Sequence, residues 1–419
     1  MVTKAEIPEG YKQTEVGVIP KDWETDKIRN LTSITTGAKN TQDKVDDGDY
    51  PFFVRSSIIE RINSYSFDGE AVLTAGDGVG TGKIYHYING KFDFHQRVYK
   101  ISDFSEKLNG YYFYLFFSNN FYSRIMSMTA KSSVDSVRRE MIADMLISFP
   151  PKKAEQEAIA EMLSDTDALI ESLEKLIAKR RNIKRGAMQQ LLTGKKRLPG
   201  FGVVNGKSVG YKQTEIGMIP KDWDVVMLGD CLAKNPEYGI NAPAVPFSDN
   251  LSVYIRITDI SDDGRFLPEK KTSVDHARAN KYLLELGDVV LARTGASTGK
   301  SYLYNPKDGE LVFAGFLIRC KTKENKLYSQ YLKQFLGTHI YWNWVRVMSM
   351  RSGQPGINGN EYAQLPLPLP PTKAEQTAIT QVLSDMDAEI ESLEQKRDKY
   401  KAIKQGMMQK LLTGRIRLV

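Results

Sequence analysis

An internal repeat is the feature that most constrains how this 419-residue chain can fold. Residues 10–23 read GYKQTEVGVIPKDW and residues 210–223 read GYKQTEIGMIPKDW, so the two segments differ at only two positions. A longer block repeats as well, because residues 150–198 align without a gap to residues 370–418 and agree at 30 of 49 positions. The two inserts between these segments barely resemble each other. A constant frame around divergent inserts predicts one scaffold that carries two different binding surfaces.

The longer repeated block predicts a long helix in each copy. It follows a pair of prolines and is rich in Ala, Glu, Gln, Leu and Lys, which favour helices. Extending to Gln190 and Lys410, each helix would hold about 38 residues and measure about 57 Å. Apolar residues recur at steps of three and four, the spacing of a coiled-coil seam. They are Leu163, Ile170, Leu173 and Ile177 in the first helix, and Leu383, Met386, Ile390 and Leu393 in the second.

Capping motifs occur at the start of, and inside, these helices. The segment Thr372–Glu375 has the form of a capping box at the start of the second helix. Ser164–Asp167 and Ser384–Asp387 have a similar form within the helices, so a break near Ser164 and Ser384 stays open at this point.

Charge is polarised along both helices. In the first, all seven acidic residues lie between Glu155 and Glu174, and most basic residues follow. The second has the same order, with acidic residues from Glu375 to Asp398 and a basic end. Parallel packing would place acid against acid, whereas antiparallel packing places each acidic half against a basic half. We therefore predict an antiparallel pair. Two unconnected helices with solvated charges are the alternative.

The frame also predicts how the chain ends meet. Arg197-Leu198 is followed by a linker and the second GYKQTE segment, whereas Arg417-Leu418 lies at the end of the sequence. If both inserts are framed alike, the end of the second helix approaches the first GYKQTE segment. Trp23 and Trp223 then either take part in binding a partner or fill the base of their own domain.

Each insert reads as mixed α/β structure. The predicted strands are 50–54, 71–74 and 84–88 in the first insert and 253–257, 288–291 and 301–304 in the second. Aromatic-rich helices are predicted at 110–126 and 328–348. Faint matches, such as Gly78 with Gly295 and Gly82 with Gly299, indicate one fold with two different surfaces.

Composition points to an acidic partner in a reducing compartment. The net charge is +7 and the pI is about 9.0, which favours nucleic acid, although a membrane surface would fit the charge equally well. Cys231 and Cys320 form no CxxC pair and read as ordinary buried thiols of a cytoplasmic protein. The most apolar run, 111–117, is far shorter than the ~20 residues that cross a bilayer.

The motifs that suggest catalysis fail on inspection. The glycine–lysine segments 80–83 and 295–301 resemble a phosphate-binding loop, but that loop needs four residues between its glycines and the second segment has three. These segments are instead predicted to be tight turns, with lysines that either face a phosphate backbone or lie in solvent. Neither double proline follows the polar residue typical of amino-methyltransferases, and the four histidines show no metal-binding spacing. The chain reads as non-catalytic.

The repeated GYKQTE–PKDW segments, together with the PPxKAEQxAI helices that end in LLTG, resemble the specificity subunits of type I restriction–modification systems. The resemblance covers essentially the whole chain. It implies target-recognition domains at 1–150 and 210–370, spacer helices at 151–198 and 371–419, and a linker at 199–209. The expected fold is α+β, with two mixed α/β domains joined by two long antiparallel helices in a coiled-coil spacer and a pseudo-twofold repeat.

The resemblance also implies a function. Each target-recognition domain would read one half of a split double-stranded DNA sequence, and the helices would set the gap. The subunit would recruit two adenine-N6 methyltransferase subunits and, in the full complex, restriction–motor subunits. S-adenosylmethionine, ATP and Mg²⁺ would belong to those partners, with no cofactor in this chain. Exposed helix faces in the frame are the expected docking surfaces.

Residues for DNA contact are predicted near strand ends and turns, because the side chains of Arg, Asn and Gln fit base edges and lysine binds phosphate. They are Arg55, Ser56, Lys83, Arg97, Lys131 and Arg138 in the first insert, and Arg256, Thr258, Arg293, Lys300, Arg351, Gln354 and Asn358 in the second. Each could equally be an ordinary surface or structural residue. A coiled-coil adaptor without a DNA role and a degenerate nucleotide-dependent enzyme are the rival interpretations.

Overall fold

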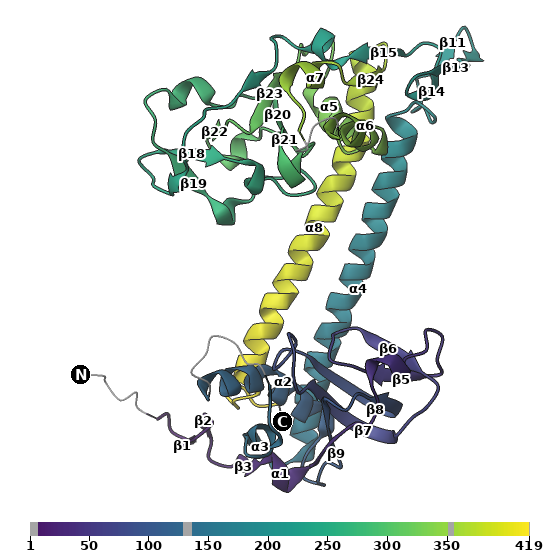
Figure 1. The fold of residues 1–419 in the computed structure, drawn as a ribbon. Coiled ribbons are helices and arrows are strands. Elements are labelled where there is room, and N and C mark those ends of the chain that lie inside the picture. Colours follow the sequence, from purple (N-terminus) through teal and green to yellow (C-terminus); the bar gives the residue numbers. More distant parts are fainter. Residues whose placement is uncertain (1–6, 129–135, 351–355, 419) are drawn as a thin grey trace. The chain divides into compact units, whose positions relative to one another are not determined.

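The structure is a computed structural model that describes residues 7–128, 136–350 and 356–418. The chain forms two compact units (Figure 1). Unit 1 contains residues 1–174 and 395–419, and unit 2 contains residues 175–394. Each unit therefore combines one insert with part of both long helices, α4 (Lys153–Leu191) and α8 (Lys373–Leu411). Both helices run without a break through Ser164 and Ser384, so the breaks left open from the sequence do not occur.

In unit 1 the two helices pack antiparallel, as the charge pattern predicts. Asp167 accepts a hydrogen bond from Lys404 at 2.6 Å, and Glu174 accepts one from Lys401 at 2.7 Å. Residue numbers rise along α4 while those of their partners fall along α8, which defines the antiparallel direction. The acidic half of α4 thus faces the basic half of α8.

Unit 2 repeats the arrangement with the charges exchanged. Lys184 of α4 donates to Asp387 of α8 at 2.6 Å, and Arg181 pairs with Glu394. These pairs are the repeat equivalents of Lys404–Asp167 and Lys401–Glu174. Antiparallel packing therefore places complementary charges together in both units.

The apolar seam is buried along both helices. The side chains of Leu163, Ile170, Leu173, Ile177, Leu383 and Ile390 are at most 8% exposed, and Met386 and Leu393 are half-buried. Burial of these side chains, at about 25 cal/mol per Å² of apolar surface, stabilises the helix pair more than its exposed ion pairs do.

The insert of unit 1 is built on one six-stranded sheet. Its strand order is β4-β9-β7-β8-β5-β6, with β5 parallel to β8 and the other neighbours antiparallel. The strands are β4 (Ser33–Thr36), β5 (Tyr50–Phe53), β6 (Ile59–Ile62), β7 (Phe67–Ala75), β8 (Tyr85–Phe94) and β9 (Val98–Ser102). The three predicted strands correspond to β5, β7 and β8.

The insert of unit 2 has two four-stranded sheets, β16-β23-β20-β21 and β17-β19-β18-β22. The strands are β16 (Glu237–Tyr238), β17 (Val245–Pro246), β18 (Ser252–Ile255), β19 (Thr272–Val274), β20 (Asp288–Ala292), β21 (Ser301–Leu303), β22 (Leu311–Phe313) and β23 (Leu317–Lys321). The order matches unit 1 if the long strand β8 corresponds to β21 and β22 together. Pro306 and Gly309 interrupt the chain between β21 and β22, which divides one sheet into two. The inserts thus share the order of six strands, and β17 is an additional edge strand of unit 2.

Helices cover one side of each insert. In unit 1 the aromatic helix α2 (Gly110–Ser127) follows the sheet and is succeeded by α3 (Arg139–Ala143). Its residues Phe113, Phe117 and Phe121 stack in a row with ring centroids 4.5–5.4 Å apart and form the centre of the core. Short helices complete the set: α1 (Ile28–Leu31) in unit 1 and α7 (Gly359–Ala363) in unit 2.

The single helix predicted at 328–348 is wrong, because the structure has two. They are α5 (Ser329–Phe335) and α6 (His339–Ser349). The helical conformation is interrupted at Gly337, and the Thr338 hydroxyl then accepts a hydrogen bond from the backbone N–H of Tyr341. A glycine followed by an N-cap threonine ends one helix and begins the next, although the apolar spacing continues through both.

The repeated segment forms the same small frame in both units. In unit 1 a hairpin of β1 (Tyr11–Thr14) and β2 (Gly17–Pro20) precedes β3 (Glu24–Lys27), which pairs with β10 (Leu146–Phe149). Unit 2 repeats this with β13 (Tyr211–Thr214), β14 (Gly217–Pro220), β15 (Asp224–Met227) and β24 (Pro366–Leu369). The linker between the repeats adds a hairpin of β11 (Val203–Val204) and β12 (Lys207–Ser208).

The end of α8 meets the N-terminal frame, as the repeat predicts. The Tyr11 hydroxyl donates to the Gly414 carbonyl at 3.1 Å, and Arg417 donates to both oxygens of Asp22 at 2.9 and 3.0 Å. Trp23 and Trp223 are completely buried, so they fill the bases of their domains, and the alternative that they form a partner-binding surface is wrong.

One predicted cap takes a different role. The Thr372 hydroxyl accepts from the Glu375 N–H at 3.3 Å, as a cap should. The Glu375 carboxylate, however, is held by Arg197, and both its oxygens accept hydrogen bonds from that guanidinium. The stronger charge-assisted pair thus replaces the second bond of the capping box.

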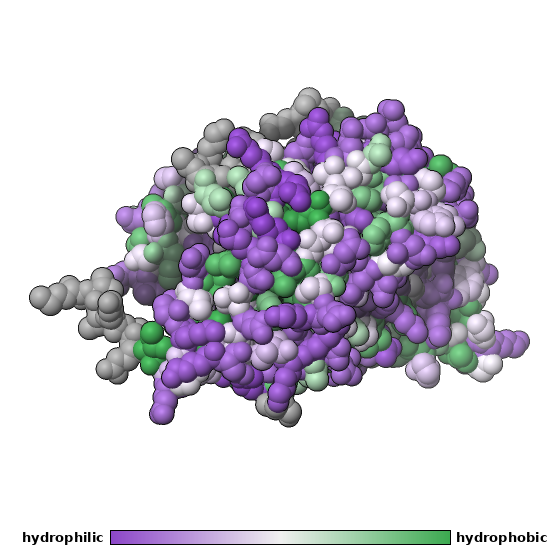
Figure 2. Space-filling view, turned by 90° about the horizontal axis from the view of Figure 1, so that it is seen from below, coloured by the Kyte–Doolittle hydropathy of each residue, from purple (hydrophilic) through white to green (hydrophobic). Residues whose placement is uncertain are grey.

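Within the described part of the chain, no helix is both long and apolar enough to cross a membrane. The face seen in Figure 2 is mostly hydrophilic, with hydrophobic residues scattered over it in small groups. Cys231 and Cys320 are free and buried, as predicted, and burial raises the pKa of the Cys320 thiol to about 12.

Candidate nucleic-acid interface

The glycine–lysine segments form one turn that occurs in both units. In unit 1 Gly78 has a φ of 86°, and the Thr81 hydroxyl donates to its carbonyl at 2.6 Å. In unit 2 Gly295 has a φ of 69°, and the Thr298 hydroxyl donates to its carbonyl at 2.8 Å. The predicted tight turns are confirmed. Positive φ explains why glycine stands at both positions.

Backbone bonds anchor the turn in the same way in each unit. The N–H of Gly76 donates to Arg97 O at 2.8 Å, and the N–H of Val137 donates to Gly76 O at 2.7 Å. In unit 2 the equivalent bonds run from Arg293 N–H to Phe316 O at 3.0 Å and from Ile357 N–H to Arg293 O at 2.9 Å. These bonds establish that Arg97 and Phe316 occupy equivalent positions. Val79 and Ala296, which follow the first glycine of each turn, are equivalent as well.

Around the turn of unit 1 the side chains are charged. Asp77 accepts hydrogen bonds from Arg55 at 2.9 Å and from Arg97. Partial burial raises the pKa of the Asp77 carboxyl, but the bonds from Arg97 and Arg55 outweigh it, so the net pKa lies below its ordinary value. Lys83 lies 5.4 Å from the centroid of the Tyr122 ring. Two cations, Arg55 and Arg97, thus bind one carboxylate, and the structure brings them together as candidate contacts.

In unit 2 the same location has different chemistry. Thr294 replaces Asp77, and Phe316, which is 56% exposed, replaces Arg97. Arg293 lies over the Tyr238 ring at 5.0 Å, and Lys300 pairs with Asp262 at 2.7 Å. One backbone arrangement therefore presents two different sets of side chains.

Other predicted contact residues have structural partners. Arg256, which directly follows β18, forms two hydrogen bonds of 2.8 Å with the buried Asp259. Thr258 donates to the same carboxylate at 3.2 Å. Asn358 caps α7 by accepting from the Glu361 N–H at 3.0 Å. Two-point base contact by Arg256 or Asn358 would compete with these bonds.

Of the remaining candidates, Ser56 donates to Ile58 O at 3.0 Å in the loop after β5. Arg138 is exposed at the start of α3. Lys131, Arg351 and Gln354 lie outside the described residues.

Three exposed apolar positions were missed by the sequence reasoning. They are Val79, Ala296 and Phe316, of which Val79 is fully exposed. The sequence does contain a signal for the first two, because the paired glycines place them at the tips of equivalent turns. The signal for Phe316 is the alignment of β9 with β23, which becomes clear only once the strands are paired.

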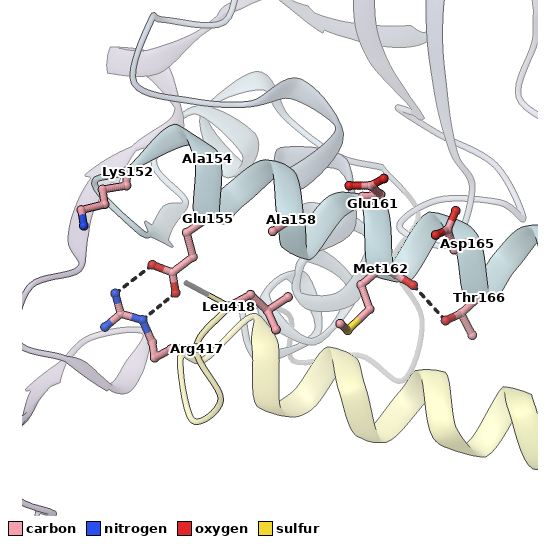
Figure 3. A pocket seen from close by; sticks show the side chains of 10 residues that line it. All are labelled: Lys152, Ala154, Glu155, Ala158, Glu161, Met162, Asp165, Thr166, Arg417 and Leu418. Atoms are coloured by element: carbon pink, nitrogen blue, oxygen red, sulfur yellow. Dashed lines mark hydrogen bonds and ion pairs between the residues drawn. The ribbon is translucent and has the colours of Figure 1, made fainter.

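A second feature of unit 1 is an open groove of about 820 Å³ along the first turns of α4. Arg417 and Glu155 close one end by two hydrogen bonds, and Leu418 and Met162 lie on the side of α4 that faces α8 (Figure 3). Glu161 and Asp165 point to the other side. Met162 is 40% exposed, so the frame presents apolar surface next to acidic residues.

Among the described residues, no group of three His, Cys, Asp or Glu side chains is placed to hold a metal ion. Paired, basic and exposed side chains at strand-end turns are the features of a surface that binds a polyanion. The structure therefore has two related modules, each with its own set of side chains around an equivalent turn.

The chain belongs to the family described as the type I restriction modification DNA specificity domain, whose model matches residues 20–179 and 220–402. The family assignment based on the repeated motifs is confirmed.

Curated relatives extend along almost the full chain. The MjaVIII specificity subunit of a type I restriction enzyme from Methanocaldococcus jannaschii is 26% identical, over 98% of this chain and 96% of its own. The EcoDI specificity subunit from Escherichia coli is 23% identical, over 96% of this chain and 89% of its own.

The fold is also found in a solved structure. The S subunit of a type I restriction–modification system from M. genitalium matches with a TM-score of 0.62 at 15% identity, over 93% of this chain and 96% of that one. The expected architecture of two α/β modules joined by antiparallel helices is thereby confirmed.

Proposed function

We propose that this chain is the non-catalytic DNA-recognition subunit of a type I restriction–modification complex and reads a two-part site, one half per unit. The observation that carries the proposal is the duplicated turn, which keeps its backbone and anchoring bonds while its surrounding side chains change. A family whose members are specificity subunits supplies the ligand class. Two unlike readers on one frame correspond to two unlike half-sites, and the helices set the distance between them.

The frame is the proposed docking surface for two adenine-N6 methyltransferase subunits. Both units share the frame, so two copies of one partner can bind it in the same manner. In unit 1 the groove beside Met162 and Leu418 offers apolar surface for a partner helix. Restriction–motor subunits would join the full complex.

Catalysis and its cofactors are assigned to those partners. S-adenosylmethionine would be bound by the methyltransferase subunits, and ATP with Mg²⁺ by the motor subunits. The complex would act on DNA in the cytoplasm, where two buried free thiols remain reduced.

Mapping methylated adenines in cells that express this chain with its cognate modification subunit tests the proposal. The expected result is methylation within one split sequence, with two specific halves and a fixed gap. A single uninterrupted site, or no sequence-specific methylation when both subunits are expressed and folded, contradicts it. A gel shift across salt concentrations separates the adaptor interpretation, because only a DNA-binding chain shows affinity that falls as salt rises.

A further inference from the structure

Two positions in each unit combine a shared backbone with different, exposed side chains. We propose that Val79 and Arg97 in unit 1, and their counterparts Ala296 and Phe316 in unit 2, determine specificity by contacting base edges. The inference rests on the proposed function and deepens it, since it says which positions of the shared fold read the sequence and what each can recognise.

The backbone of the turn is the same in both units at the positions where the side chain differs. In both units the first glycine has positive φ, the threonine hydroxyl caps its carbonyl, and the flanking backbone bonds match. The residue at the tip nevertheless changes from valine to alanine, and the residue beside it changes from arginine to phenylalanine. A constant backbone that carries different side chains is the arrangement that two domains need to recognise different sequences.

The Val79 side chain is fully exposed. Its relative exposure is 101%, so it contributes no packing to unit 1. The turn is held by the backbone conformation of the glycines on either side and by the bond from the Thr81 hydroxyl to the Gly78 carbonyl. It therefore does not depend on the valine side chain. Its two methyl groups are therefore available to a ligand. The thymine 5-methyl group is the apolar feature of the major groove that such a side chain can contact.

The charged side chains around the Val79 turn favour the binding of DNA. Arg55, Arg97 and Lys83 contribute three positive charges near the turn, and Asp77 contributes one negative charge. Arg97 is anchored to Asp77 through Nη1, while its side chain is 61% exposed. A guanidinium fixed in this way is prepared to bind guanine O6 and N7. Unit 1 is therefore expected to read a thymine and a guanine close together.

Unit 2 presents apolar groups at both positions. Ala296 gives a smaller tip, and Phe316 is 56% exposed where unit 1 has Arg97. Alanine and phenylalanine both contact the thymine methyl group and have no hydrogen-bonding groups for guanine. Unit 2 is expected to read an A·T pair at this place, and not a G·C pair.

The test begins with adenine methylation mapping of Val79→Ala and Ala296→Val. Val79→Ala is expected to weaken the preference for A·T at one position of one half-site and leave the other half unchanged, and Ala296→Val is expected to strengthen that preference in the other half only. Val203→Ala is the matched control, because Val203 is 62% exposed in the β11–β12 hairpin and should change neither half.

Purified full-length chain then tests the contact directly. Replacing each thymine of the unit 1 half-site by deoxyuridine removes only the methyl group. At one thymine the wild type should lose affinity by about tenfold, as expected for burying one or two methyl groups. At the same thymine Val79→Ala should lose less affinity, because alanine makes a smaller apolar contact with the methyl group. This double-mutant cycle isolates the contact from any general effect on folding.

Several results overturn the inference. One is a unit 1 half-site without an A·T pair. Another is an equal deoxyuridine effect in wild type and Val79→Ala at every thymine, and a third is equal weakening of both halves by Val79→Ala. If a split methylation site is found and neither variant changes it, the proposed function stands and this inference fails. If the wild type methylates no split site, both fail.

Discussion

In each frame one arginine binds two carboxylates, and this ion-pair cluster allows a quantitative test of the packing. In unit 2 Arg197 donates to Asp222 at 2.9 and 3.1 Å and binds both oxygens of Glu375. The Glu375 side chain is 1% exposed, and that of Arg197 is 12% exposed. Removing the guanidinium leaves a buried carboxylate without its counter-ion. Breaking such a pair typically costs 3–5 kcal/mol, so we expect Arg197→Met to destabilise unit 2 by about 3 kcal/mol.

Urea unfolding followed by tryptophan fluorescence measures this loss, because Trp223, Trp342 and Trp344 lie in unit 2 and only Trp23 lies in unit 1. The double variant Arg197→Met/Glu375→Met should recover most of the lost stability, since replacing both partners by apolar groups removes the uncompensated charge.

The equivalent ion-pair cluster in unit 1, formed by Arg417 with Asp22 and Glu155, provides the matched comparison. Glu155 is as deeply buried as Glu375, but Asp22 is 53% exposed, against 26% for Asp222, so solvent screens one of the two carboxylates left behind more strongly in unit 1. Arg417→Met should therefore destabilise unit 1 by less than Arg197→Met destabilises unit 2. A loss below about 1 kcal/mol for Arg197→Met, or a double variant less stable than the single one, would refute the reasoning.

Three further predictions follow from the titratable groups and the ion pairs. Hydrogen bonds from Arg417 lower the pKa of Asp22, so wild-type unit 1 should lose stability as pH falls from about 4 through that lowered pKa, and Arg417→Met should lack this part of the pH dependence in urea titrations. Burial lowers the pKa of Lys333 to about 8, so its protonated form is disfavoured in the folded state. Wild-type unit 2 should therefore gain stability, by at most about 3 kcal/mol, as pH rises from about 8 to about 10.5. Calorimetry should show this gain for the wild type and not for Lys333→Met. Arg265 ties the 261–265 loop to Glu394 at 3.1 Å, so Arg265→Ala should speed hydrogen exchange in that loop while the unit 1 frame exchanges as before.

Sequence reasoning worked best where one simple pattern decides the structure. Repeated charge blocks determined the direction of the helix pair, because only antiparallel packing relieves acid–acid repulsion along its length. The helix bounds came within a residue of the observed Leu191 and Leu411, since proline and glycine mark the ends. The interior capping patterns at Ser164 and Ser384 did not break the helices, because the buried seam continues through them.

What the sequence could not supply is the tertiary partner of a side chain. Arg256 follows an apolar strand as Arg55 does, yet it pairs with Asp259 three residues on, whereas Arg55 reaches across to Asp77. Equally, the exposure of Val79 follows from the turn conformation. A valine otherwise reads as a core residue.

The breaks in the inserts illustrate the same limit. The spacing of apolar residues continues from α5 into α6, because both helices pack against one core. The sequence pattern therefore does not show that a helix ends before Gly337. Long-range pairing, rather than local propensity, decides that β8 is one strand and that its counterpart is two.

The central claim is that two readers are held at a distance that the helices fix. Inserting one heptad after Ile177 in α4 and one after Arg397 in α8 keeps the seam in phase and lengthens the helix pair by about 10 Å. Because ten base pairs of B-DNA rise about 34 Å, mapped adenine methylation should show the same two half-sites with the gap widened by about three base pairs. An unchanged gap, or altered half-sites with the gap retained, would contradict the account.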